Sequence, residues 1–205
     1  MTKVKKIALL ILSMLLPSLT VAGYAIFARV SPVDDTSAKI NIKDVRMYYV
    51  GNNQVLDSFL DRAQLVGAQT TPLEMQELKR TGADLTAMSV VLMDGGWISQ
   101  QVSNTEVHAF LRQAVSQGAK LAAIGGSTAA FLEALDKAKI NELPRNETTG
   151  SLINPAGSSN PLVVGFKLIQ ATTPYGEQYS VPSILLGGNA EAYDMFDYIT
   201  SWIGS

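Results

Sequence analysis

The chain has no cysteine among its 205 residues. It therefore cannot form a disulfide, a zinc–thiolate site or a cysteine nucleophile. Many small exported domains depend on disulfides, so here the hydrophobic core must hold the fold alone. The length is sufficient for one domain of about 150 residues and an additional segment.

Histidine is almost as scarce, because His108 is the only one. No cluster of metal-ligating side chains is visible in the sequence, and we expect no metal and no cofactor.

Basic residues are few outside the N-terminus. Residues 1–29 hold four of the 16 basic residues and none of the 18 acidic ones, which leaves 12 basic and 18 acidic residues, a net charge of −6, in the remainder. No basic run is interleaved with aromatic residues. Such a surface repels phosphate backbones, so we expect no nucleic-acid partner.

Charge is absent from residues 7–28, a run of 22 positions that follows Lys3, Lys5 and Lys6. A membrane-spanning helix needs about 20 apolar residues. Flanking lysines favour a cytoplasmic N-terminus. We expect a transmembrane anchor over residues 1–29, a polar linker over 30–43 and an extracytoplasmic domain over 44–205, which together make a single-pass protein of the cell membrane.

A cleaved signal peptide is the alternative to this anchor. The triplets at residues 20–22 and 23–25 are passable cleavage sites, and Pro17 precedes them. However, the apolar region of a signal peptide spans about 7–15 residues. The run here continues through Phe27, so we favour the retained anchor.

Strand-like and helix-like segments alternate from residue 44 onward. We expect buried strands at residues 89–94 and 120–126, and a helix over 104–117 that is opened by a capping box of Ser103 and Glu106. Between them, residues 95–101 are expected to form a loop. Two late β-rich segments, 162–172 and 179–187, are compatible with an antiparallel extension. The pattern predicts an α/β fold with a doubly wound, mainly parallel sheet and flanking helices.

Residues 83–135 carry a pattern of buried strands and glycines that includes Asp94-Gly-Gly96 and Ile124-Gly-Gly-Ser127. This pattern resembles the class I glutamine amidotransferase-like superfamily, in which a nucleophile turn follows the second of these strands. The family's cysteine would fall near Gly125 or Gly126, and its C-terminal His-Glu pair is also missing. The resemblance therefore implies the family's fold without its usual activity.

Ser127 is the remaining candidate nucleophile in that turn. A serine nucleophile needs a base within hydrogen-bond reach, and His108 is the only histidine available. Asp94, at the carboxyl end of a buried strand, is the candidate acidic partner. These three residues define an alternative function, an extracytoplasmic hydrolase or small-ligand binder. We favour a structural interpretation in which Ser127 caps a helix and Asp94 accepts backbone hydrogen bonds.

The favoured function is a non-catalytic, membrane-anchored accessory or scaffold subunit of a membrane or cell-envelope complex. Trp97 and Ile98 are candidate contact residues in the loop after Asp94. The anchor carries small or weakly polar residues that permit close helix packing: Ser13, Ser18, Thr20 and Gly23. We therefore expect the lipid bilayer and other membrane subunits as partners, with outer loops around Trp97 and residues 144–160 adding contacts. Asn146 fits a glycosylation sequon in a polar loop, and an unmodified asparagine is the favoured alternative, because such triplets often arise by chance.

Overall fold

The computed structural model describes residues 41–125, 129–153, 161–187 and 192–205. They belong to one compact unit built around a six-stranded mixed sheet with the strand order β2-β1-β3-β4-β5-β6. The strands are β1 (Arg46–Val50), β2 (Gln69–Pro72), β3 (Ser89–Asp94), β4 (Lys120–Ile124), β5 (Val163–Thr172) and β6 (Gln178–Gly187).

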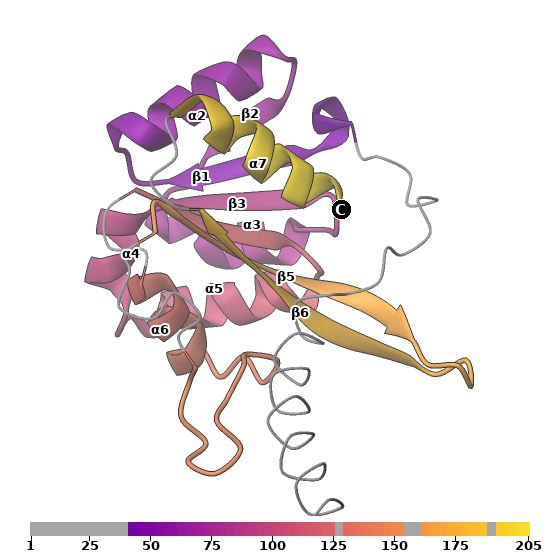
Figure 1. Cartoon of the computed structure of the whole chain (residues 1–205). Helices are drawn as coiled ribbons and strands as arrows, with labels where there is room; N and C mark the ends of the chain where they lie inside the picture. The colour runs from indigo at the N-terminus through magenta and orange to yellow at the C-terminus, as the bar shows by residue number, and fades with distance from the viewer. Residues whose placement is uncertain (1–40, 126–128, 154–160, 188–191) are drawn as a thin grey trace, which may run out of the picture. The chain divides into compact units, whose positions relative to one another are not determined.

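Helices cover both faces of the sheet (Figure 1). The helices are α2 (Gln54–Leu65), α3 (Leu78–Asp84), α4 (Gly95–Gln101), α5 (Thr105–Ser116), α6 (Ala129–Lys137) and α7 (Ala192–Gly204), with 3-10 turns η1 (Ile42–Asp44) and η2 (Met75–Glu77). One core lies between the sheet and helices α3 to α6, and the other lies between the sheet and α2 and α7.

The sheet is parallel in one part only. β1 pairs in parallel with β2 and β3, and β3 pairs in parallel with β4. β5 then runs antiparallel to β4, and β6 runs antiparallel to β5. The expectation of a mainly parallel sheet therefore holds for the first four strands, whereas the late strands form the antiparallel hairpin that the sequence allowed.

Two sequence expectations about residues 95–104 are wrong. Residues 95–101 form helix α4 rather than a loop, because Asp94 caps the first backbone N–H groups and Ile98 is fully buried in the core. Helix α5 is capped by Asn104 rather than Ser103, because the Asn104 side chain accepts the hydrogen bond from the N–H of Glu106. In both cases a short polar side chain satisfies N–H groups that the helix itself leaves free.

The outer half of the β5–β6 hairpin extends beyond the rest of the domain (Figure 1). The inner residues of β5, from Val163 to Lys167, are buried, whereas the outer residues are half-buried or exposed. All ten residue pairs of the hairpin remain in register, from Val163 opposite Gly187 to Thr172 opposite Gln178.

No helix among the described residues is long and apolar enough to span a membrane. The apolar run at residues 7–28 lies outside the described residues, so the anchor remains a prediction from the sequence.

Candidate functional site

The carboxyl ends of β1, β3 and β4 form the natural place for a site in this fold. From β1 the chain crosses to β2 through α2 on one face of the sheet. From β3 it crosses to β4 through α4 and α5 on the other face. The strand order therefore switches direction between β1 and β3. Open α/β sheets bind their ligands at such a switch point, beyond the carboxyl ends of the strands.

Asn53 occupies the centre of this switch point. Its side-chain oxygen accepts hydrogen bonds from the N–H groups of Val55, at 3.0 Å, and Leu56, at 2.9 Å, and so caps α2. Its amide nitrogen donates to Asp94 Oδ1 at 2.6 Å and to the carbonyl of Ile124 at 2.8 Å. An asparagine amide has two donor hydrogens and an oxygen with two lone pairs, so all four positions are used.

Asp94 belongs to the same network. Besides Asn53, its carboxylate accepts from the N–H of Gly96 at 3.0 Å and from the N–H of Trp97 at 3.1 Å. These bonds cap α4, where the helix dipole also stabilises a negative charge. The described contacts of Asp94 are thus those of a helix-capping residue, as the structural interpretation of the sequence expected.

Two glycines allow the three strand ends to come this close. Gly51 and Gly125 have φ values of 77° and 72°, in the left-handed region that L side chains rarely adopt. A Cβ atom on Gly51 would lie 2.6 Å from the Asp94 Cβ, and one on Gly125 would lie 2.8 Å from the Asn53 Oδ1. The backbone at Gly51 and Gly125 therefore lies close to the side chains of Asp94 and Asn53. We name Gly51, Asn53, Asp94 and Gly125 the strand-end network.

Ser127 lies outside the described residues, so its proposed role as a nucleophile or a helix cap is not tested. The structure describes only the two sides of its turn. Before it, the Gly125 N–H donates to the carbonyl of Leu162 at 2.7 Å, and after it, α6 begins at Ala129.

His108 is almost fully buried on α5, and its Nε2 lies 2.7 Å from the carbonyl oxygen of Val102. Val102 directly follows α4, so this hydrogen bond ties the connection between α4 and α5. One of the two ring nitrogens of the candidate base is thus engaged with a backbone carbonyl. This described hydrogen bond involves neither Asp94 nor any other acidic group.

Trp97 and Ile98 do not form the exposed loop that the sequence suggested. Both lie in α4. Ile98 is 0% exposed, so it is not available for contact with a partner, and Trp97 is half-buried against the core. The expectation that Ile98 is an interface residue is wrong because helix formation turns its side chain into the core.

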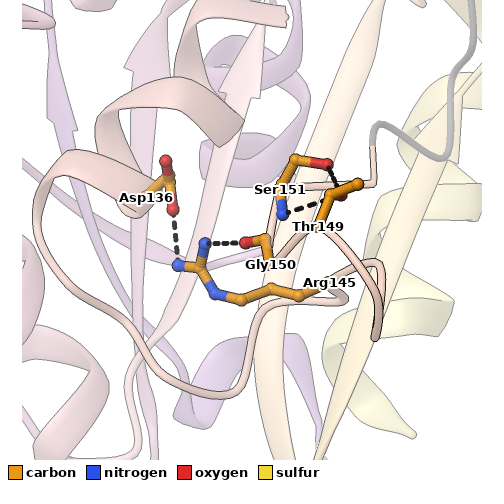
Figure 2. Close-up of polar contacts among 5 residues, drawn as sticks. All are labelled: Asp136, Arg145, Thr149, Gly150 and Ser151. Atoms are coloured by element: carbon orange, nitrogen blue, oxygen red, sulfur yellow. Dashed lines mark hydrogen bonds and ion pairs between the residues drawn. The ribbon is translucent and has the colours of Figure 1, made fainter.

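Asn146 is exposed in a loop that has a definite fold. Its side-chain oxygen accepts from the N–H groups of Thr148 and Thr149, each at 2.9 Å. Arg145 ties the loop to α6 by donating to Asp136 at 2.5 Å, and it also donates to the carbonyl of Gly150 at 3.3 Å (Figure 2). Glycosylation of Asn146 remains a prediction from the sequon.

Two buried lysines at the opposite edge of the sheet escaped the sequence reasoning. Lys120 donates to the carbonyl of Ala87 at 2.8 Å. Lys167 donates to the carbonyls of Trp202, at 2.5 Å, and Ser205, at 3.0 Å, and to the Ser205 hydroxyl at 2.9 Å. Burial lowers the pKa of Lys120. Burial, assisted by the positive charge of Lys120, lowers the pKa of Lys167 to about 8.

Both lysines donate to backbone carbonyl oxygens of the domain itself. Lys167 binds carbonyl oxygens at the end of α7, where a helix leaves its last acceptors unpaired and its dipole favours a cation. Among the described residues no group of three or more histidine, aspartate or glutamate side chains is arranged to hold a metal ion.

Comparisons with known proteins return no relative. No protein-family model, no curated protein and no solved structure matches the chain.

Proposed function

We propose that this protein is a membrane-anchored, non-catalytic subunit whose α/β domain lies outside the cytoplasm and serves a larger membrane or cell-envelope complex as an accessory or scaffold. The anchor rests on the 22 uncharged residues at 7–28 and the three lysines before them. The non-catalytic role of the domain is inferred from the hydrogen bonds of the strand-end network.

The observation that carries the non-catalytic part of the proposal is the saturation of Asn53. Catalytic groups need polar atoms that are free to contact a substrate or to exchange a proton. At this switch point both ends of the Asn53 amide are committed to protein partners, and Asp94 holds the first turn of α4. This edge of the sheet holds three strands and two helices together by hydrogen bonds.

The resemblance to the class I glutamine amidotransferase-like superfamily fits the same proposal. In that interpretation the chain keeps the strand, glycine pair and turn of the family, while cysteine is absent and the sole histidine binds the Val102 carbonyl. The order β2-β1-β3-β4 of the parallel strands is also the one found at the start of flavodoxin-like sheets.

Tethering is useful to a domain of this kind because it raises the local concentration of the domain near a neighbour in the same membrane. Short flexible links give effective concentrations in the millimolar range. In this proposal the polar residues before η1 connect the anchor to the domain, and the small residues of the anchor favour packing against other membrane helices.

Purification of the full chain from its native membrane in a mild detergent tests this proposal. We expect one or more integral membrane proteins to co-purify in fixed proportion, and to be lost when residues 7–28 are replaced by an unrelated transmembrane segment. A native protein that runs as a monomer with no companion contradicts the accessory role.

A serine-reactive fluorophosphonate tests the competing hydrolase function. We expect no labelling of the wild-type chain. Labelling that disappears in Ser127→Ala, with the folded state retained, contradicts a non-catalytic domain.

A further inference from the structure

The outer half of the β5–β6 hairpin presents an apolar strip with no partner among the described residues. Side chains alternate between the two faces of a strand. Lys167 and Gly165 face α7, because Lys167 binds its last carbonyls and a Cβ on Gly165 would meet Trp202. Ile169 and Ala171 therefore continue this face beyond the end of α7.

The opposite strand completes the strip. Ile169 pairs with Val181, and Ala171 pairs with Tyr179. Tyr175 lies in the turn between the strands. Ile169 is 42% exposed, Tyr179 is 50% exposed and Tyr175 is 92% exposed. We name Ile169, Ala171, Tyr175, Tyr179 and Val181 the hairpin strip.

The backbone of the turn that carries Tyr175 is ordered by hydrogen bonds and by its residue types. The Gly176 N–H donates to the Thr173 carbonyl at 2.9 Å, and the Glu177 N–H donates to the Thr173 hydroxyl at 3.1 Å. Gly176 has a φ of 86°, and Pro174 restricts the backbone before it. The turn therefore places the Tyr175 backbone at the far end of the hairpin, where its side chain is 92% exposed.

The strip lies at the edge of the sheet where the described part of the chain begins. Arg46 starts β1 opposite Ser89, the first residue of β3, and Lys120 starts β4 opposite Val90. Because β4 and β5 are antiparallel and Leu121 pairs with Phe166, Lys167 of β5 lies beside Lys120, the first residue of β4. Residues 168–172 thus extend beyond the amino edge of the sheet, and the chain enters the domain through η1 at this same edge.

The lengths of the hairpin and the linker are compatible. Five residues of strand project by roughly 17 Å. Residues 30–40, between the predicted anchor and η1, span at most about 40 Å when extended. The linker therefore allows the amino edge to approach a bilayer closely enough for the hairpin tip to touch it.

We propose that the hairpin strip is a second membrane contact, in which Tyr175, Tyr179 and Ile169 insert into the interfacial layer of the bilayer that holds the anchor. This inference rests on the proposed anchor. Tyrosine is favoured at the boundary between headgroups and hydrocarbon. Residues 168–182 contain one charged residue, Glu177, so little charge must be desolvated.

Two further features bear on how this surface can make a contact. Pro182 lacks an N–H in the middle of β6, which opposes the addition of a further strand at this edge. The net charge of −6 after residue 29 gives no attraction to anionic lipids, so the contact depends on apolar burial.

Because the natural chain has no cysteine, a single introduced thiol can report on the tip. Full-length Gln178→Cys, labelled with an environment-sensitive dye and reconstituted into phosphatidylcholine vesicles, places the dye beside the strip without altering it. Full-length Gln54→Cys is the matched control, because Gln54 is exposed at the start of α2, at the carboxyl edge of the sheet. We expect spin-labelled lipid to quench the dye at position 178 and not at position 54. The further change of Tyr175→Ser and Tyr179→Ser should abolish the quenching.

Flotation of the vesicles separates the two proposals. A chain that floats with the vesicles but shows no lipid quenching at position 178 overturns the hairpin contact and leaves the anchor intact. Shielding of position 178 from aqueous iodide without lipid quenching also overturns the hairpin contact, since a protein surface then covers the strip. A chain that does not float overturns the anchor, and the hairpin contact with it.

Discussion

The carboxyl and amino edges of the sheet differ in how their side chains are used. At the carboxyl edge, Asn53 and Asp94 fix three strand ends and two helices with bonds that use every polar position of the asparagine amide. At the amino edge, the hairpin leaves its apolar strip exposed. At the edge that usually holds a ligand in such folds, Asn53 and Asp94 bind each other and the backbone, whereas at the opposite edge Ile169, Tyr175 and Tyr179 are exposed.

This contrast suggests where the domain interacts with its surroundings. A saturated polar network contributes stability and a unique arrangement of the strands. An exposed apolar surface on a projecting element is typical of a contact with another molecule or a membrane. The predictions below test whether the two edges differ in this way.

The largest effect is expected at Asn53. Asn53→Ala removes a helix cap, takes the Asn53 donor away from the Ile124 carbonyl and removes one of the three described hydrogen bonds to Asp94, so the free energy of unfolding should fall by roughly 2–4 kcal/mol. Asn104→Ala is the matched control, because Asn104 also caps a helix but reaches only Gln101 besides. Its cost should be about 1 kcal/mol. Equal losses in chemical denaturation would contradict a special role for Asn53.

Alanine substitutions at Gly51 and Gly176 compare how tightly the two edges are packed. Gly51→Ala combines a left-handed backbone with a Cβ placed 2.6 Å from the Asp94 Cβ, whereas a Cβ on Gly176 meets nothing within 4 Å. We expect Gly176→Ala to cost about 1–2 kcal/mol for the backbone alone. Gly51→Ala should cost at least about 1 kcal/mol more. Thermal or urea unfolding of the two variants measures the difference, and similar costs would show that the carboxyl edge is not tightly packed.

Lys167 provides a test that depends on pH. Its pKa of about 8 in the folded protein lies below the ordinary value of 10.5, so between these pH values the unfolded chain binds more protons than the folded one. Stability from this group should therefore rise as the pH increases from about 8 to 10.5, and the penalty should be fully present below pH 8. Lys167→Met removes this contribution.

The measurement is the difference in unfolding free energy between wild type and Lys167→Met over that range. Using the difference cancels the titration of groups that both proteins share. The wild type should gain on the variant as the pH rises. A difference that is constant with pH would mean that burial does not lower the pKa of Lys167.

The smallest effects on folding are expected at the hairpin tip and the Asn146 loop. Tyr175→Ser should change the unfolding free energy by less than about 0.5 kcal/mol, because the side chain is 92% exposed. Arg145→Ala, which removes the half-exposed ion pair with Asp136, should cost roughly 0.2–1 kcal/mol. A loss above about 2 kcal/mol at Tyr175 would show that the tip packs within the domain, contrary to a free contact surface.

The sequence predicted those parts of the fold that depend on local patterns. The strands predicted at residues 89–94 and 120–126 are the buried strands β3 and β4, the second of which ends at Ile124, and the glycine after α5 ended that helix as expected. Helix α4 was missed because two glycines at its start have poor helix propensity. Its formation depends on capping by Asp94 and burial of Ile98.

Only one side chain of the strand-end network could be predicted from the sequence. Asp94 was predicted from its place at the end of a strand, whereas no local pattern distinguishes Asn53 from an ordinary helix cap. Its link to β3 and β4 depends on residues 41 and 71 positions away. Lys167 interrupts an apolar strand, and only the position of α7 explains why its amine is buried.

The central claim is that residues 7–28 hold this domain at a membrane, and the mature protein itself tests it most directly. Cell membranes should be washed with alkaline carbonate, and the retained protein identified by intact-mass spectrometry. We predict that the protein stays in the membrane fraction with a mass that includes residues 7–28. A protein released by the wash, with a mature chain that begins near Gly23 or Ile26, would contradict the anchor, the accessory role and the second membrane contact together.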